Sequence, residues 1–140
     1  MPPPDQTPSA DPTGFLHSAM PFAALIGATA VAAGPDEVHL RLEWDPTRTT
    51  TAGLLHGGAI MALADTAGGW AAYLNLPPTA TGTATISSST NFMRPLTEGH
   101  LDAVARVLHK GRTTIVVDTE LRDAQDRLVA RVTQTQAVLT

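Results

Sequence analysis

A long apolar segment from Leu54 to Leu74 constrains the fold of this chain more than any other feature. After His56, its hydrophilic interruptions are Asp65 and the small Thr66. A helix on a protein surface carries an apolar stripe and a polar back, whereas this segment is apolar on nearly every face. The sequence therefore predicts a buried helix around which the remaining chain is wrapped.

Asp65, near the middle of this segment, is the first candidate functional residue. A carboxylate in an apolar interior costs several kcal/mol unless it is neutralised, paired or facing a wet cleft. A lone carboxylate at such a position indicates a chemical role.

Gly57 and Gly58 mark a second candidate feature at the expected start of the helix. The first amides of a helix have no intrahelical acceptor, and they point along the positive end of the helix dipole, so they can bind an anion or a developing oxyanion. The glycines can equally serve only a tight turn or close packing. For His56, which precedes them, we favour a structural role that fixes the loop presenting the Gly57 amide over a direct catalytic one.

The motif His56-Gly57-Gly58, followed by Leu63-Ala64-Asp65-Thr66, resembles the signature of hotdog-fold acyl-CoA thioesterases of the PaaI-like type, which are related to the 4-hydroxybenzoyl-CoA thioesterases. Residues 91–96, 110–113 and 128–139 also resemble that family in order and spacing. The resemblance implies an α+β hotdog fold, in which one long central helix is wrapped by a curved, mainly antiparallel sheet of about five to six strands.

The pattern along the chain agrees with this architecture. Proline-rich residues 1–13 are expected to be a disordered leader, and residues 14–140 a single domain. Pro21 limits any helix between residues 15 and 26 to short pieces. Alternating or β-branched patterns separated by turn residues predict the strands, which are expected at residues 28–33, 38–44, 81–93, 101–110, 113–122 and 128–139.

Composition excludes several classes of protein. The chain has 140 residues, 43% of them hydrophobic, and a formal charge of −4, with nine scattered basic residues, so we expect no nucleic-acid partner. Cysteine is absent, which fits a cytoplasmic location. The apolar run at residues 15–34 has no positive charge before it, so we expect neither a signal peptide nor a membrane partner. The five histidines lack the close pairing of metal sites, and we expect no metal and no cofactor.

Thioester hydrolysis needs few groups, because a thiolate leaves without a strong general acid. The Gly57 amide would polarise the carbonyl, and Asp65 would either attack it or remove a proton from water; the sequence leaves both routes open. These residues lie about 12 Å apart along one helix, so one helix cannot supply both to one carbonyl. We therefore expect a homodimer with shared active sites, as the resemblance also implies, and further pairing into a dimer of dimers.

The resemblance adds supporting residues. Thr85 falls where the family often has a hydroxyl that steers the water or the carboxylate. Thr50 falls where the family often has an asparagine or glutamine, and this departure puts the reaction rate in doubt. The positions that the resemblance places along coenzyme A are Gly58, Arg94, Lys110, Gly111 and Arg112.

Together, these observations predict an acyl-CoA thioesterase acting on a medium-chain or aryl-acyl thioester, with coenzyme A present only as part of the substrate. A non-catalytic acyl-CoA-binding or regulatory hotdog protein is the alternative that Thr50 favours. A hotdog dehydratase or hydratase is a more distant alternative, because those enzymes use a different helix motif.

Overall fold

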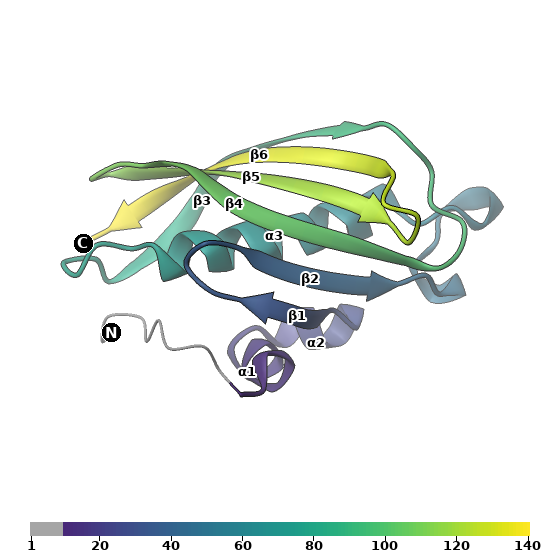
Figure 1. Ribbon diagram of the computed structural model, residues 1–140, viewed down its shortest axis with the longest axis horizontal. Helices are drawn as coiled ribbons and strands as arrows, with labels where there is room; N and C mark the ends of the chain where they lie inside the picture. The colour runs from purple at the N-terminus through teal and green to yellow at the C-terminus, as the bar shows by residue number, and fades with distance from the viewer. Residues whose placement is uncertain (1–9) are drawn as a thin grey trace.

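The computed structural model describes residues 10–140 as one antiparallel sheet curled around one long helix (Figure 1). The six strands are ordered β1-β2-β4-β5-β6-β3. The helices are α1 (Pro12–Ala19), α2 (Pro21–Ile26) and α3 (Gly57–Leu74), with 3₁₀ turns η1 (Pro46–Arg48) and η2 (Thr51–Gly53). The strands are β1 (Thr29–Ala33), β2 (Val38–Glu43), β3 (Gly82–Phe92), β4 (His100–Lys110), β5 (Thr114–Asp123) and β6 (Leu128–Leu139). The predicted hotdog fold is confirmed.

Helix α3 has defined ends. At its start, the His56 imidazole Nδ1 accepts a hydrogen bond from the Gly58 amide at 2.8 Å, which satisfies one of the first-turn amides. At its end, Asn75 follows the last helical residue, and Pro77 and Pro78 prevent the helix from continuing. Helix α3 packs against β2, β3, β4, β5 and β6, so it lies across most of the concave face of the sheet.

The core lies between α3 and the inward positions of the strands. Alternation along β2, β4, β5 and β6 places about every second side chain on this side. Fully buried members from the sheet and from the helix include Leu40, Leu42, Leu101, Val117, Leu121, Val132, Leu63, Ala67 and Ala71. Burial of these side chains from both elements fixes how α3 is rotated relative to the sheet.

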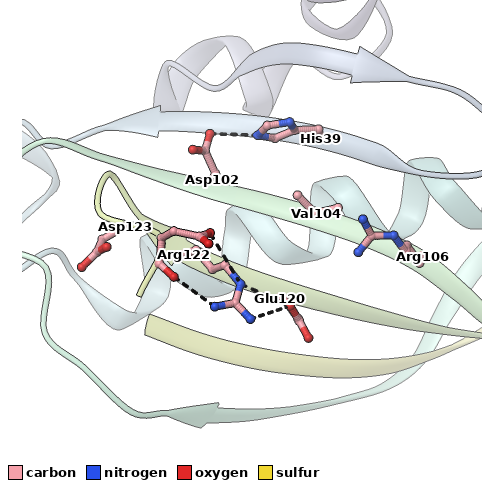
Figure 2. Close-up of a pocket in the computed structure, with 8 residues that line it drawn as sticks. His39, Asp102, Val104, Arg106, Glu120, Arg122 and Asp123 are labelled. Atoms are coloured by element: carbon pink, nitrogen blue, oxygen red, sulfur yellow. Dashed lines mark hydrogen bonds and ion pairs between the residues drawn. The ribbon is translucent and has the colours of Figure 1, made fainter. Parts of the chain in front are cut away.

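The opposite face of the sheet carries charged side chains that pair with one another, both between strands and within one strand (Figure 2). Asp102 on β4 accepts a hydrogen bond from Arg41 Nε at 2.8 Å, and its other neighbour on β2 is His39 Nε2 at 2.9 Å. On β5, Arg122 lies 3.0 Å from Glu120. A pocket of about 270 Å³ lies among these groups, but their charges already neutralise one another within the chain. This face is therefore a network of ion pairs rather than a site of free charge.

The pKa of Asp102 reflects this network. Burial alone would raise it, but hydrogen bonds from Arg41 and His39 outweigh burial and hold the pKa below its ordinary value. A carboxyl group with a depressed pKa in the folded protein stabilises the fold above its unfolded pKa of about 3.9, and this contribution is lost as the pH falls through the folded value.

The substitution Asp102→Asn is expected to lower the free energy of unfolding by about 2 kcal/mol at pH 7, because charged hydrogen bonds from β2 are lost. The difference from wild type should shrink below about pH 4, where the wild-type carboxyl group also takes up a proton. Urea unfolding followed across this pH range measures the difference. A gap that stays constant down to about pH 2 would contradict the assigned role of the carboxylate.

One expectation for the central helix is wrong. The chain does not wrap α3 on every side, and Asp65 is exposed rather than buried. Exposed or half-exposed residues recur along one face of the helix and include Gly58, Met61, Asp65 and Tyr73. Helix α2 borders this mostly apolar face but leaves residues such as Met61 and Asp65 exposed, which explains how a helix without a polar back has an exposed side.

Strand β3 borders this uncovered face. It is the last strand in the sheet, so one of its edges has no partner strand among residues 10–140. Its side chains are mostly exposed, and they include Ile86 at 61% and Phe92 at 52% exposure. An open sheet edge with apolar side chains is a template for pairing with another strand.

The predicted boundary of the leader at residue 13 is also wrong. Asp11 caps α1 by accepting a hydrogen bond from the Gly14 amide at 2.9 Å, and the Thr13 hydroxyl donates to the Ala30 carbonyl at 3.2 Å. Helix α1 therefore includes Thr13 and is attached to β1. The remainder of the leader prediction, residues 1–9, lies outside the described residues.

Candidate active site

Asp65 lines a pocket of about 480 Å³ between α3, α2 and the beginning of β3. The walls are mainly apolar or small side chains, a composition suited to an acyl group beside a carboxylate. The pocket is lined by Met20, Phe22, Ala23, Asp65, Thr66, Gly69, Tyr73, Gly82, Thr83, Ala84, Thr85, Gln136 and Leu139.

Two side chains hold the carboxylate, and both bind the same oxygen. The Thr85 hydroxyl donates to Asp65 Oδ1 at 3.3 Å, and Gln134 Nε2 donates to this atom at 3.5 Å. Thr85 was expected near the carboxylate from the family resemblance, and the fold brings the two residues together from β3 and α3. Asp65 Oδ2 has no hydrogen-bond donor among the described residues.

Gln134 and its neighbour Gln136 are site residues that sequence reasoning missed. Both are 1% exposed, although glutamine is mostly found on surfaces. Gln136 Nε2 donates to the Thr85 hydroxyl at 2.7 Å. A signal was present, because two amides recur with period two in a strand whose other inward positions, Ala130 and Val132, are apolar. That pattern places both amides on the side facing the helix.

Gly68 makes room for the buried amide of Gln134. A Cβ atom at Gly68 would lie 2.1 Å from Gln134 Oε1, whereas a Cβ atom at Gly69 would meet open space. The two adjacent glycines of α3 therefore differ in their surroundings. Gly68 leaves space for the Gln134 amide from β6, and Gly69 lines the pocket beside Asp65.

The two glycines provide a matched pair of substitutions. Gly69→Ala is expected to raise the free energy of unfolding by about 0.5–1 kcal/mol, because alanine is the better helix former and its methyl group has space. Gly68→Ala is expected to lower it by about 1–3 kcal/mol, because the methyl group overpacks against Gln134. Chemical denaturation of both variants measures the two effects. Equal effects of the two substitutions would contradict this assignment.

The Gly57 amide lies at the other end of the site. Among the described residues, this amide has no hydrogen-bond acceptor. Gly57 lines a separate pocket of about 360 Å³, together with Thr50, Phe92 and Arg94. Within one protomer, the candidate oxyanion donor and the carboxylate therefore border different pockets.

The His56 imidazole caps α3 by accepting a hydrogen bond from the Gly58 amide, and its expected role in fixing the loop that presents the Gly57 amide stays a prediction. This bond uses the Gly58 amide and leaves the neighbouring Gly57 amide available. The acceptor Nδ1 is unprotonated, so a neutral ring carries its proton on Nε2. A direct catalytic part for the imidazole stays a prediction.

The expected coenzyme A residues do not lie together in one protomer. Arg94 follows β3 and lies beside Gly57. Lys110 ends β4, and Gly111 and Arg112 lie in the turn to β5, which is closed by a hydrogen bond from the Gly111 amide to the Thr114 carbonyl at 2.8 Å. This turn lies at the opposite end of the sheet from Arg94 (Figure 1).

Among residues 10–140, no three acidic or histidine side chains are grouped so that they could hold a metal ion, and the expected absence of a metal stays a prediction. Within the same range, no helix combines the length and the apolar character needed to span a membrane.

Comparison with known proteins identifies the family. Residues 52–130, which include Gly57, Asp65 and Thr85, match the Thioesterase superfamily. The chain belongs to this superfamily, and the predicted family and hydrolase class are confirmed.

Individual relatives agree over nearly the whole chain. Rv1847 of Mycobacterium tuberculosis, which bears a provisional esterase name, is 29% identical over 126 residues, covering 89% of this chain and 90% of its own. The crystal structure of a mutant of thioesterase PA1618 from Pseudomonas aeruginosa has a TM-score of 0.85 at 28% identity and covers 94% of this chain and 96% of that chain. The PaaI protein of the E. coli phenylacetic acid degradation operon, at 21% identity, shares the fold with a TM-score of 0.80, covering 92% of this chain and 91% of its own.

Proposed function

We propose that this protein is an acyl-CoA thioesterase that hydrolyses a medium-chain or aryl-acyl thioester to a free acid and coenzyme A. The observation that carries this proposal is the Asp65 carboxylate, which accepts a hydrogen bond from Thr85 and lines a largely apolar pocket. Superfamily membership supports the reaction class. The size and the mainly apolar lining of the pocket support a medium-chain or aryl acyl group as the part of the substrate that binds there.

The proposed active site forms between two copies of the chain. A Cβ atom at Gly57 would lie 3.4 Å from the Phe92 ring, and Asp65 is hydrogen-bonded to Thr85. The Gly57 amide therefore lies near the end of β3, and the Asp65 carboxylate lies near its beginning. Antiparallel pairing of two β3 edges about a two-fold axis midway between Thr85 and Phe92 would bring Gly57 of one subunit near Asp65 of the other. The small residues 87–90 at the centre of the strand allow this approach.

The chemistry uses few groups. The Gly57 amide donates to the thioester carbonyl oxygen and stabilises the negative charge that develops there. Asp65 either attacks the carbonyl carbon, forming an anhydride that water then hydrolyses, or removes a proton from the attacking water. In both routes the carbon–sulfur bond breaks and the sulfur leaves as the thiolate of coenzyme A.

The proposed pairing of two β3 edges would also place basic residues of both subunits close together. It brings Arg94 of one subunit toward the turn at Lys110 and Arg112 of the other, where the phosphates of coenzyme A can bind. A dimer of dimers would also cover part of α2, on which Leu25 is 80% exposed. The cytoplasmic location stays a prediction.

Release of free thiol from a panel of acyl-CoAs tests the proposed function. We expect turnover that depends on the acyl group and reaches its maximum with medium-chain or aryl substrates. Binding of acyl-CoA without thiol release would favour the alternative of a binding or regulatory protein, which the threonine at position 50 also favours. Neither binding nor release across the panel would overturn the proposal.

A further inference from the structure

The direction of the hydrogen bonds around Asp65 is set by its carboxylate, which can only accept. The Thr83 hydroxyl donates to the Ala137 carbonyl at 2.8 Å and lies 3.1 Å from Gln136 Oε1, and Gln136 Nε2 donates to the Thr85 hydroxyl at 2.7 Å. Because an amide nitrogen can only donate, Thr85 must accept this bond. The one proton of the Thr85 hydroxyl is then directed to Asp65 Oδ1, at 3.3 Å.

A second donor reaches the same oxygen from the neighbouring position of β6. Gln134 Nε2 lies 3.5 Å from Asp65 Oδ1. The opposite amide orientation would turn Oε1 toward the carboxylate, and the two oxygens would repel each other. Both donors thus bind Oδ1, and Oδ2 has no donor among the described residues.

We propose that Gln134 and Gln136 are positioning residues that select Oδ2 of Asp65 as its reactive oxygen. Gln134 acts directly on the carboxylate, and Gln136 acts through Thr85. The inference rests on the proposed thioesterase function. It assigns to β6 a role in orienting the carboxylate, whichever of the two routes Asp65 follows.

The burial of Gln134 supports a functional role over a structural one. Its side chain is 1% exposed, and its Oε1 atom has no hydrogen-bond partner in the described part of the chain. A buried polar atom without a partner lowers stability, and a similarly shaped apolar side chain would remove this penalty. Gly68 also gives up helix propensity to admit the amide. The unpartnered oxygen and the helical glycine both lower stability, and such destabilising features are typical of functional sites.

The experiment compares Gln134→Met and Gln136→Met, which keep side-chain length and remove the donors, with Thr135→Val as a control. Thr135 lies between them on β6 and faces the other side of the sheet. We expect each methionine variant to lose about 10- to 100-fold in kcat, because the carboxylate is no longer held in one orientation. KM should stay within about twofold. The control should match wild type.

Thermal unfolding separates this role from a structural one. We expect Gln134→Met to melt about 3 °C above wild type while turning over more slowly, because the unpartnered oxygen is gone. A lower melting temperature with an unchanged kcat would show a structural role and overturn the proposal. Wild-type kcat in both methionine variants would also overturn it.

Epistasis tests the path through Thr85. In a Thr85→Val background, Gln136→Met should cause no further loss of kcat, whereas Gln134→Met should. Thr85→Ser, which keeps the hydroxyl, should recover most of the kcat that Thr85→Val loses. Thr85 is exposed, so its variants remain informative even if Gln136→Met fails to fold. If Gln136→Met lowered kcat equally in the wild-type and Thr85→Val backgrounds, Gln136 would not act through the Thr85 hydroxyl.

Failure of this inference is distinguishable from failure of the proposed function. If wild type releases thiol and Asp65→Asn does not, while the methionine variants match wild type, the function holds and the positioning role is wrong. If wild type releases no thiol from any acyl-CoA tested, the function is wrong, and the positioning role falls with it.

Discussion

Replacing Asp65 with asparagine is expected to lower kcat for thioester hydrolysis by at least about 100-fold and to leave the fold intact. The asparagine carbonyl oxygen can take the place of Oδ1 and accept the hydrogen bonds from Thr85 and Gln134. Its amide nitrogen then occupies the place of Oδ2, where it can neither attack a carbonyl carbon nor accept a proton. The side chain is exposed in the protomer, so the substitution places no new polar group in the core.

The measurement is steady-state thiol release, with circular dichroism and thermal unfolding as checks on the fold. Asp36→Asn serves as the matched control, because it removes the same charge from an exposed residue in the turn between β1 and β2. We expect the control to keep wild-type kcat. Near-wild-type turnover by a folded Asp65→Asn variant would remove this carboxylate from the mechanism.

The sequence predicted most of the fold because its local patterns are strong. Residues 38–43 alternate between buried and at least partly exposed side chains, and Pro77 stops the central helix, so the element boundaries were predicted to within a few residues. The break at Pro21 likewise separates α1 from α2. These features depend only on neighbours along the chain, which a sequence displays directly.

The environment of Asp65 could be predicted only in part. The carboxylate and Gly57 were recognised because each departs from its local pattern. Gln134 and Gln136 reach Asp65 through strand register: Thr85 pairs with Gln136, and the β3–β6 register shifts between Thr85 and Ser87. A one-residue slip would turn both amides away from the helix, so this contact is a property of the sheet rather than of either strand.

The exposed face of α3 has a different explanation. An apolar helix face has the same sequence pattern whether its own chain or a second copy covers it. Met61 is 43% exposed in the protomer, beside the open edge of β3. The apolar pattern of this face therefore does not distinguish a cover by the same chain from a cover by a second copy, which the proposed dimer would supply.

The shared active site can be tested with two inactive variants, of which Gly57→Pro is the first. Gly57 is the first residue of α3, a position that favours proline, and its amide has no acceptor to lose among the described residues. The preceding residue, His56, has φ −63° and ψ 131°, an extended conformation that proline accepts in its predecessor. The nearest atom to a Cβ at this position is 3.4 Å away, on the Phe92 ring. Proline should therefore remove the amide proton without disturbing the helix.

Refolding a mixture of Gly57→Pro and Asp65→Asn chains is expected to restore roughly a quarter of wild-type activity, although each variant is inactive alone. Random two-fold pairing makes half of the dimers mixed, and each mixed dimer has one doubly damaged site and one intact site. The intact site combines the Gly57 amide of one chain with the Asp65 carboxylate of the other. Wild type refolded in the same way provides the reference.

A chain that carries both substitutions, refolded with Asp65→Asn, provides the control, because no pairing of these two chains supplies an Asp65 carboxylate. Its activity should stay at background. If the Gly57 amide and Asp65 acted within one protomer, every site in the first mixture would also keep a defect, and mixing would restore nothing. Background activity from mixed dimers that are folded and of the expected mass would therefore exclude the shared site. The axial separation of about 12 Å between the two residues on one rigid helix makes recovery the expected result.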